Sequence, residues 1–233
     1  MNIFLSEPEV VSALVKLDFS IAVLRLYAII PANAITTIRT IYSYEREQKI
    51  GQEQSQTKEE KFNYLRAWPV EEAAGTILYA LTRYLKPNLI LECGTSFGVS
   101  AIFFASALKE NNKGKVITVE VSKLKHQAAQ KNFQNAEVED WVQQEKVAFD
   151  QYLKKLETPI DIVFLDCDRS RYAFYFKALL PYLQVGSLII ADNALDRAKD
   201  LAHYKELVEK DTRFITALIT VGDGLLISKR LAI

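Results

Sequence analysis

Cysteine and histidine are scarce in this sequence, and their scarcity narrows the kinds of site it can hold. The 233 residues include two cysteines and two histidines. Cys93 and Cys167 are too far apart in sequence for any metal-ligand spacing, so we expect two reduced thiols. His126 and His203 each fall within an expected helix, without ligand spacing around them. The sequence therefore gives no sign of a zinc site.

An excess of charge and a long hydrophobic run are also missing. Lysine plus arginine and aspartate plus glutamate number 29 each, so nothing favours nucleic acid or an acidic membrane surface as partner. The most apolar stretch, residues 14–30, is interrupted by Lys16, Asp18 and Arg25 and ended by Pro31, so we expect no membrane span. Residues 1–7 lack the basic start of a signal peptide. We expect a cytoplasmic protein.

What the sequence does contain is a regular alternation of apolar strands and helices after residue 88. Residues 7–30 and 32–48 show helical spacing, the polar run 51–60 predicts a loop or boundary, and 71–85 predicts a further helix. The strands that we expect are 89–93, 115–121, 145–148, 160–166, 187–192, 214–220 and 224–229. The helices between them include 99–109, 122–133, 172–183 and 196–210.

This order of elements predicts the fold class. Alternation of helices with strands rich in valine, isoleucine and leucine indicates a parallel sheet covered on both faces. Only residues 221–224 separate the last two strands, which predicts a hairpin. We therefore expect an α/β fold with a Rossmann-like, doubly wound, seven-stranded, mostly parallel sheet and a C-terminal antiparallel hairpin. A helical N-terminal region would take residues 1–68 and the sheet domain residues 69–233.

The most informative motif is the run LILECGTSFGVS, residues 89–100, in which an apolar strand leads through a glycine-containing loop into a helix. Ligands of nucleotide type bind at this turn in doubly wound sheets. Ser96 replaces the second glycine of a dinucleotide fingerprint, and no Gly-Lys-Ser/Thr follows for a phosphate loop. Glu92 suits a cationic ligand such as S-adenosylmethionine, which carries no phosphate. An ordinary loop with two turn glycines, Gly94 and Gly98, is the alternative.

Acidic residues also follow three later strands. Glu120 ends the second strand, where a carboxylate can accept hydrogen bonds from both ribose hydroxyls, although a surface glutamate is the alternative. Asp166 ends the fourth strand, and Asp192 and Asn193 end the fifth. Because these two strands are neighbours in such a sheet, their oxygens would converge and suit Mg²⁺, Mn²⁺ or Ca²⁺. Helix capping is the alternative for these side chains.

Five stretches in order resemble the metal-dependent O-methyltransferases of the caffeoyl-CoA and catechol type: LILECGTSFGVS, GKVITVEVS, IDIVFLDCDRSRY, GSLIIADNAL and VGDGLLISKR. The resemblance runs from about residue 69 to the C-terminus. It implies an enzyme that uses S-adenosylmethionine and a divalent cation to methylate a hydroxyl of a small catechol-like molecule or hydroxylated secondary metabolite. It also implies a homodimer, since this family is often dimeric.

The resemblance implies a role for individual residues as well. The divalent cation, Mg²⁺ or else Mn²⁺ or Ca²⁺, would be bound by Asp166, Asp192 and Asn193. Asp166 and Arg169 would act at the reacting groups. The methyl donor would lie against Glu92, Gly94, Thr95, Ser96, Gly98, Ser100, Glu120, Val121, Ala148, Phe149, Asp166, Asp168 and Tyr172.

The sequence departs from the family pattern in three places that affect the acceptor. Arg169 stands where the family commonly has a lysine that serves as general base, and arginine stays protonated at working pH. We expect it to orient the acceptor or stabilise a phenolate. The loop after Asn193 is short, and the N-terminal helical region, a candidate acceptor lid or dimer contact, does not match. Two alternatives stay open: a metal-independent methyltransferase acting on another oxygen or nitrogen, and a non-catalytic partner that binds the donor.

Overall fold

The structure, a computed structural model, describes residues 29–55 and 65–232. Its N-terminal helices and the first half of the sheet are α3 (Ala32–Gln54), α5 (Glu72–Leu85), β1 (Leu89–Cys93), α6 (Val99–Asn111), β2 (Lys115–Val119), α7 (Lys123–Asn135), η1 (Glu139–Trp141) and β3 (Val142–Glu145). The second half contains α8 (Phe149–Leu153), β4 (Ile160–Leu165), η2 (Arg169–Arg171), α9 (Tyr172–Leu179), η3 (Leu180–Tyr182), β5 (Leu183–Ala191), α10 (Ala198–Lys210), β6 (Phe214–Ile219) and β7 (Leu225–Arg230).

The seven strands form one sheet in the order β3-β2-β1-β4-β5-β7-β6. The first five strands pair in parallel, whereas β7 pairs antiparallel with both β5 and β6. The predicted sheet with its C-terminal hairpin is therefore confirmed. The order reverses beside β1, because the chain runs outward through β2 and β3 and then returns to β4. Ligands of doubly wound sheets bind at such a reversal.

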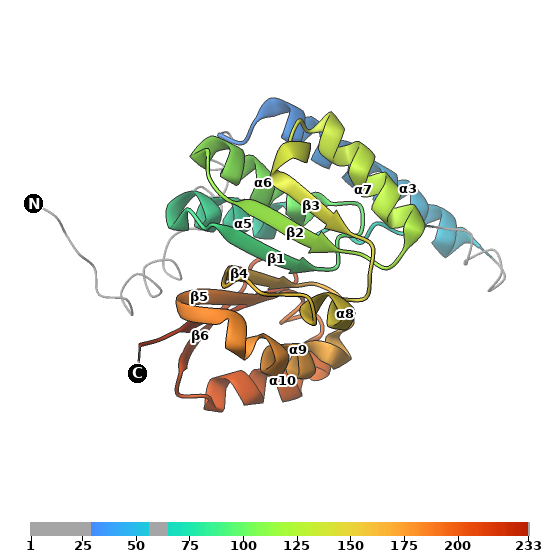
Figure 1. The fold of residues 1–233 in the computed structure, drawn as a ribbon. Helices are drawn as coiled ribbons and strands as arrows, with labels where there is room; N and C mark the ends of the chain where they lie inside the picture. Colours follow the sequence, from blue (N-terminus) through green and yellow to red (C-terminus); the bar gives the residue numbers. More distant parts are fainter. Residues whose placement is uncertain (1–28, 56–64, 233) are drawn as a thin grey trace, which may run out of the picture.

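Two hydrophobic cores lie on the two faces of the sheet. Side chains alternate along β1, so that Ile90 faces one core and Leu89 and Leu91 face the other. Figure 1 shows α3, α5, α6 and α7 over one face and α8, α9 and α10 over the other. The first ten residues of α6 are all buried, because α6 lies between the sheet and the helices outside it.

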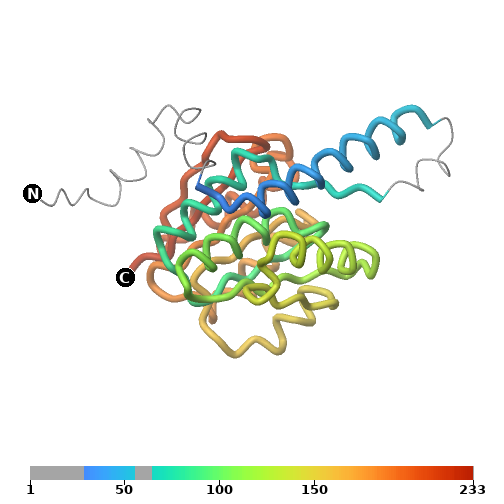
Figure 2. The backbone as a smooth tube through the Cα atoms, turned by 90° about the horizontal axis from the view of Figure 1, so that it is seen from above, coloured from blue at the N-terminus to red at the C-terminus, as the bar shows by residue number. Residues whose placement is uncertain are grey.

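The N-terminal helix α3 shares the first of these cores. Ile38 and Ile41 are buried with residues of the sheet, and α3 packs against α6 and α7. Its C-terminal part projects from the domain, beside the segment that begins at residue 65 (Figure 2). In the part of the chain described, no helix has the length and apolar character needed to cross a membrane.

Several expected boundaries were wrong. The third strand is Val142–Glu145, not 145–148, because it is an edge strand whose polar, half-exposed residues lack an apolar run. Residues 51–54 continue α3, since a polar composition does not by itself end a helix. The helix expected over 172–183 ends at Leu179, ahead of Pro181, and β5 begins at Leu183.

The other strands and helices differ from expectation by a few residues at their ends. Strand β2 ends at Val119 and β4 at Leu165, so the acids that follow both strands lie just beyond the ladder. The short helix α8 was not expected. The predicted helix over residues 7–30 lies almost entirely outside the described part of the chain. The end of the predicted loop, residues 56–60, lies wholly outside it.

Candidate active site

Four neighbouring strands bring acidic residues to one edge of the sheet. Glu92 lies in β1, Glu120 follows β2, Asp166 follows β4 and Asp192 follows β5. The strands stand in the order β2-β1-β4-β5, so their carboxyl ends are adjacent. The residues directly before Asp166 and Asp192 are register partners. The expectation that the ends of β4 and β5 converge is therefore confirmed.

The loop after β1 turns at Gly94, whose φ is 102°. A Cβ atom at this position would lie 2.0 Å from the backbone oxygen of Asp166, so only glycine fits. The backbone N–H groups of Gly94 and Thr95 donate to the Val119 oxygen at 3.0 and 3.3 Å. Gly98 then begins α6. The loop is thus fixed between β2 on one side and the backbone after β4 on the other.

Glu92 is fully buried beneath this loop. Its Oε2 accepts a hydrogen bond from the Thr118 hydroxyl, which in turn contacts the Thr95 hydroxyl at 2.5 Å. Within the described residues its other oxygen, Oε1, has no hydrogen-bond partner. Burial raises the pKa of Glu92 to about 7. A buried carboxylate with a free oxygen suits a cationic group that would lie above the loop.

Glu120 supports the loop from the side of β2. Its Oε2 accepts from the Ser96 backbone N–H at 2.9 Å, and its Oε1 accepts from the Ser122 N–H at 2.8 Å. The residue is nearly buried. Both oxygens are therefore held in place, and each still has a free lone pair for a ligand hydroxyl.

Asp166 and Asp192 repel each other at the ends of β4 and β5. Burial, together with the charge of Glu92, raises the pKa of Asp166 to about 7, although the residue keeps some exposed surface. Burial and the charge of Asp166 raise the pKa of Asp192 well above its usual range. Buried carboxylates whose pKa values are raised in this way would be stabilised in their charged form by a cation placed beside them.

Arg169 contacts the predicted cation ligand Asn193. Its Nη2 donates to Asn193 Oδ1 at 2.6 Å, while Asn193 Nδ2 donates to Asp223 Oδ2 at 3.4 Å. Asn193 has φ 64°, and its side chain does not cap α10, whose N-cap is Arg197. The capping alternative for Asn193 is therefore wrong, and the amide is a polar contact between β5, η2 and the hairpin.

The remaining residues predicted to contact the donor differ in burial and in the elements that carry them. Val121 is exposed beyond β2, Ser100 is buried in the first turn of α6, and Ala148 and Phe149 begin α8. Asp168 is exposed and caps η2, because its Oδ1 accepts from the Ser170 N–H.

Tyr172 lies inside the protein, not at its edge. It is fully buried, and its hydroxyl donates to the Leu165 oxygen at 2.8 Å and accepts from the Cys167 N–H at 3.2 Å. The hydroxyl thus fixes the backbone on both sides of Asp166. The donor contacts predicted for Tyr172 and Asp168 stay predictions.

The two cysteines meet although they are distant in sequence. Cys93 Sγ lies 2.7 Å from Cys167 Sγ, and both are free thiols, as expected. Burial raises the pKa of the Cys93 thiol well above its usual range. His126 lies in α7 and His203 in α10, also as expected.

Sequence reasoning missed two residues at this edge. Burial lowers the pKa of Lys125 on α7. The charges of Glu120 and Asp166 lie close enough to oppose this lowering in part. Its Nζ lies 4.6 Å from the centre of the Trp68 ring, and Trp68 is exposed. No motif links these positions, because they come from different segments of the chain.

No group of three or more histidine, cysteine, aspartate and glutamate side chains within residues 29–55 and 65–232 could hold a metal ion. The predicted cation ligands, Asp166, Asp192 and Asn193, include only two residues of these types. A cavity of about 480 Å³ lies between α3 and α7, lined by Ala32, Asn33, Thr36, Thr37, Thr40, Asn132 and Asn135. None of the predicted site residues lines it.

Comparisons with known proteins agree with this geometry. Residues 91–194 match the family described as "Methyltransferase domain". A catechol O-methyltransferase of Niastella koreensis is 35% identical over 131 residues, which span 54% of this chain and 58% of that protein. A caffeoyl-CoA O-methyltransferase of Populus kitakamiensis is 25% identical over 234 residues, which span 87% of this chain and 98% of that protein.

A solved structure shows the same fold over the whole chain. A Podospora anserina methyltransferase with bound S-adenosylhomocysteine superposes with a TM-score of 0.71, at 18% identity, covering 100% of both chains. The matched domain spans β1 to the residues after β5, which contain the four acids and the glycine loop. Residues 91–194 of the chain therefore match a methyltransferase domain, and the chain is similar to O-methyltransferases of the catechol and caffeoyl-CoA type.

Proposed function

We propose that this protein transfers the methyl group of S-adenosylmethionine to a hydroxyl of a small molecule with two adjacent oxygens, such as a catechol, with the help of a divalent cation. The observation that carries the proposal is the placement of Glu92, Glu120 and Asp166 around one glycine loop, with Asp192 at the end of the next strand, β5. The relatives methylate, as their names say, catechol and caffeoyl-CoA.

The donor would lie across the ends of β1 and β2. Glu120 presents two held oxygens, which can accept from both ribose hydroxyls of a nucleoside. Glu92 and Asp166 offer negative charge to the ammonium and sulfonium groups, and the donor's positive charge would lower their raised pKa values. S-adenosylhomocysteine bound to the Podospora anserina neighbour supports this choice of ligand.

The residues at the ends of β4 and β5 fit a divalent cation. Asp166, Asp192 and Asn193 supply only oxygen, and burial raises the pKa of both carboxyl groups. When bound, the cation would be chelated by the two acceptor oxygens and would lower the pKa of the bound hydroxyl. Asn193 Oδ1 would have to leave Arg169 to join the set. Arg169 would then be free to bind an anionic oxygen of the acceptor, with no lone pair to take a proton.

Methyl transfer is a direct displacement, so the protein's main task is alignment of the hydroxyl oxygen with the carbon–sulfur bond. The loop after β1, with Glu92 and Glu120, would hold the donor. The ends of β4 and β5, with Asp166 and Asp192, would hold the acceptor beside it. A homodimer, which the resemblance implies, and a cytoplasmic location, which the sequence analysis expects, stay predictions.

The test is transfer of a labelled methyl group from S-adenosylmethionine to a panel of catechols and hydroxylated aromatic compounds, with Mg²⁺ or with excess EDTA. We expect turnover on a catechol that EDTA abolishes and Mg²⁺ or Mn²⁺ restores. Full turnover in EDTA would support the metal-independent alternative. Donor binding without turnover on any acceptor would indicate the non-catalytic alternative.

A further inference from the structure

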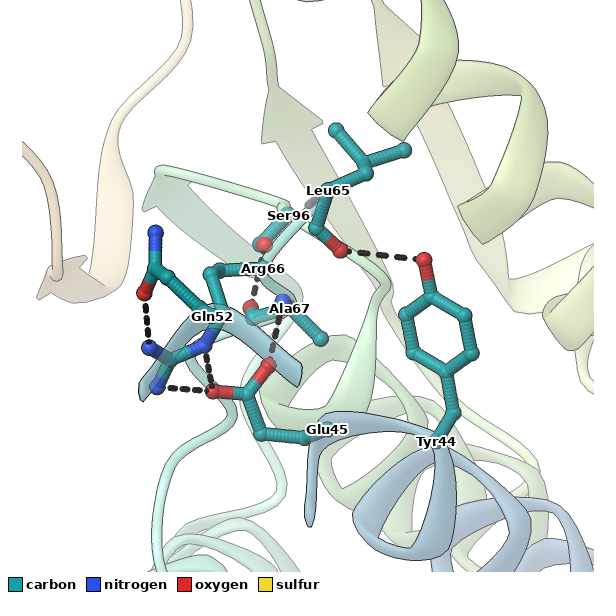
Figure 3. Close-up of polar contacts among 7 residues, drawn as sticks. All are labelled: Tyr44, Glu45, Gln52, Leu65, Arg66, Ala67 and Ser96. Atoms are coloured by element: carbon teal, nitrogen blue, oxygen red, sulfur yellow. Dashed lines mark hydrogen bonds and ion pairs between the residues drawn. The ribbon is translucent and has the colours of Figure 1, made fainter. Parts of the chain in front are cut away.

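The segment after residue 64 is fastened to α3 by one acidic side chain. Glu45 Oε1 accepts from Arg66 Nε and Glu45 Oε2 accepts from the Ala67 backbone N–H, both at 2.6 Å (Figure 3). Arg66 Nη1 donates to Gln52 Oε1 at 2.8 Å. The side chains of Glu45 and Arg66 are only 13% and 16% exposed, so solvent screens this pair weakly.

The same segment holds the loop that follows β1. The Ser96 hydroxyl donates to the Ala67 backbone oxygen at 2.5 Å (Figure 3). The Ser96 N–H donates to Glu120. Ser96 has φ 47°, in the left-handed region that residues with a Cβ occupy only at an energetic cost. These two hydrogen bonds therefore keep Ser96 in a conformation that it would otherwise leave.

Two aromatic contacts support this arrangement. The Tyr44 hydroxyl donates to the Leu65 oxygen at 3.0 Å, and the Tyr44 ring stacks on Phe97 with ring centres 5.1 Å apart. Trp68, the next residue after Ala67, lies against Lys125 beside Glu120. The segment from residue 65 thus lies between α3 and the edge of the candidate active site.

We propose that Glu45 is a positioning residue for the methyl donor. It fixes Arg66 and Ala67, the Ala67 oxygen fixes Ser96, and Ser96 fixes the carboxylate of Glu120 where the ribose would bind. Glu45 itself does not touch the donor. This inference rests on the proposed function, and it makes α3 part of the donor site, whereas the sequence suggested an acceptor lid or dimer contact.

The test is calorimetric titration with S-adenosylhomocysteine of the full chain and the variants Glu45→Gln, Ser96→Ala and the double variant. We expect Glu45→Gln to weaken binding about tenfold, the loss typical of a charge-assisted hydrogen bond. Because both changes break the same connection, the double variant should bind about as well as Ser96→Ala alone. Effects that multiply, or a Glu45→Gln variant with unchanged affinity, would overturn the proposal.

Controls separate this outcome from general loss of structure. Glu47→Gln changes an exposed acid two residues along the same helix and should leave the affinity unchanged. Arg66→Lys removes the Nε donor but keeps the charge; it should weaken binding several-fold and serves if Glu45→Gln does not fold. Failure of the unmodified protein to bind S-adenosylhomocysteine would contradict the proposed function as well, whereas tight binding with no effect of Glu45→Gln or Arg66→Lys contradicts this inference alone.

Discussion

The two halves of the candidate active site differ in how their polar groups are satisfied. At the ends of β1 and β2, Glu120, Thr118 and most amides of the loop after β1 have partners within the protein, whereas Glu92 Oε1 has none among the described residues. At the ends of β4 and β5, burial raises the pKa of both Asp166 and Asp192, and the charge of Asp166 raises that of Asp192 further. The first half is preorganised without a ligand. The second half holds like charges together and gains stability when a cation arrives.

The largest expected effect is in the second half. Asp192→Asn should lower kcat/KM by at least about 100-fold. Mutation of residues that only hydrogen-bond to a metal ligand already lowers metal affinity by about 10–100-fold, and Asp192 is a predicted ligand itself. The same change should raise the thermal unfolding midpoint at pH 8, because it removes a buried charge that Asp166 repels. Enzyme assays and thermal unfolding of one preparation test both. Glu157→Gln, at an exposed acid shortly before β4, is the control and should change neither clearly.

Gly94→Ala should break the first half. A Cβ atom would overlap the Asp166 backbone oxygen, and φ 102° disfavours any side chain, so we expect roughly 2–4 kcal/mol of destabilisation and loss of donor binding. Gly186→Ala is a matched control, since Gly186 has φ 93° with open space around it. That control should cost about 1–2 kcal/mol and leave donor affinity intact. Equal losses of donor affinity in both variants would show that Gly94 has no special role.

The stability of the ligand-free protein should fall as pH rises from about 5 to 8. The pKa of Glu92 is raised from 4.5 to about 7, so across this range the folded chain keeps a proton that the unfolded chain releases. This costs up to about 3 kcal/mol above pH 7. Asp166, with a pKa of about 7, acts in the same direction. Urea unfolding at pH 5 and pH 8 measures the difference; Glu92→Gln should reduce it, and a higher stability at pH 8 would contradict the assignment.

Arg169→Lys should have the smallest effect. If the cation activates the hydroxyl, turnover should stay within about threefold of the unmodified protein, because lysine retains the positive charge beside Asn193. Arg169→Ala should mainly raise KM for the acceptor. The pH–rate profiles on one acceptor provide the measurement. A basic-limb pKa that is present in the unmodified protein and absent in Arg169→Ala, at unchanged KM, would assign proton transfer to the arginine.

The sequence predicted the residues that end buried strands better than those brought in from other segments. Glu92, Asp166 and Asp192 each belong to or directly follow an apolar run, so parallel strand order alone brings them together. The hairpin was readable from residues 221–224 for the same local reason. The polar edge strand β3 was misplaced, because it carries no apolar alternation.

The contacts between segments could not be read in the same way. Ser96 bonds to Ala67, 29 residues earlier, and Glu45 bonds to Arg66 from a helix that packs on α6 and α7. Trp68 meets Lys125 because the segment from residue 65 packs against the loop after β1. Such contacts depend on how helices pack, and packing leaves no spacing pattern in the sequence.

The most direct test of the account is to titrate S-adenosylhomocysteine in excess EDTA into Glu120→Ala and Asp192→Asn. If the halves are separable as described, Glu120→Ala should lose at least about tenfold in affinity, from the loss of charge-assisted hydrogen bonds. Asp192→Asn should bind within about threefold of the unmodified protein while its turnover on a catechol is abolished. Unchanged affinity in Glu120→Ala, or loss of donor binding in Asp192→Asn, would contradict the division of the site into a preorganised donor half and a cation-requiring acceptor half.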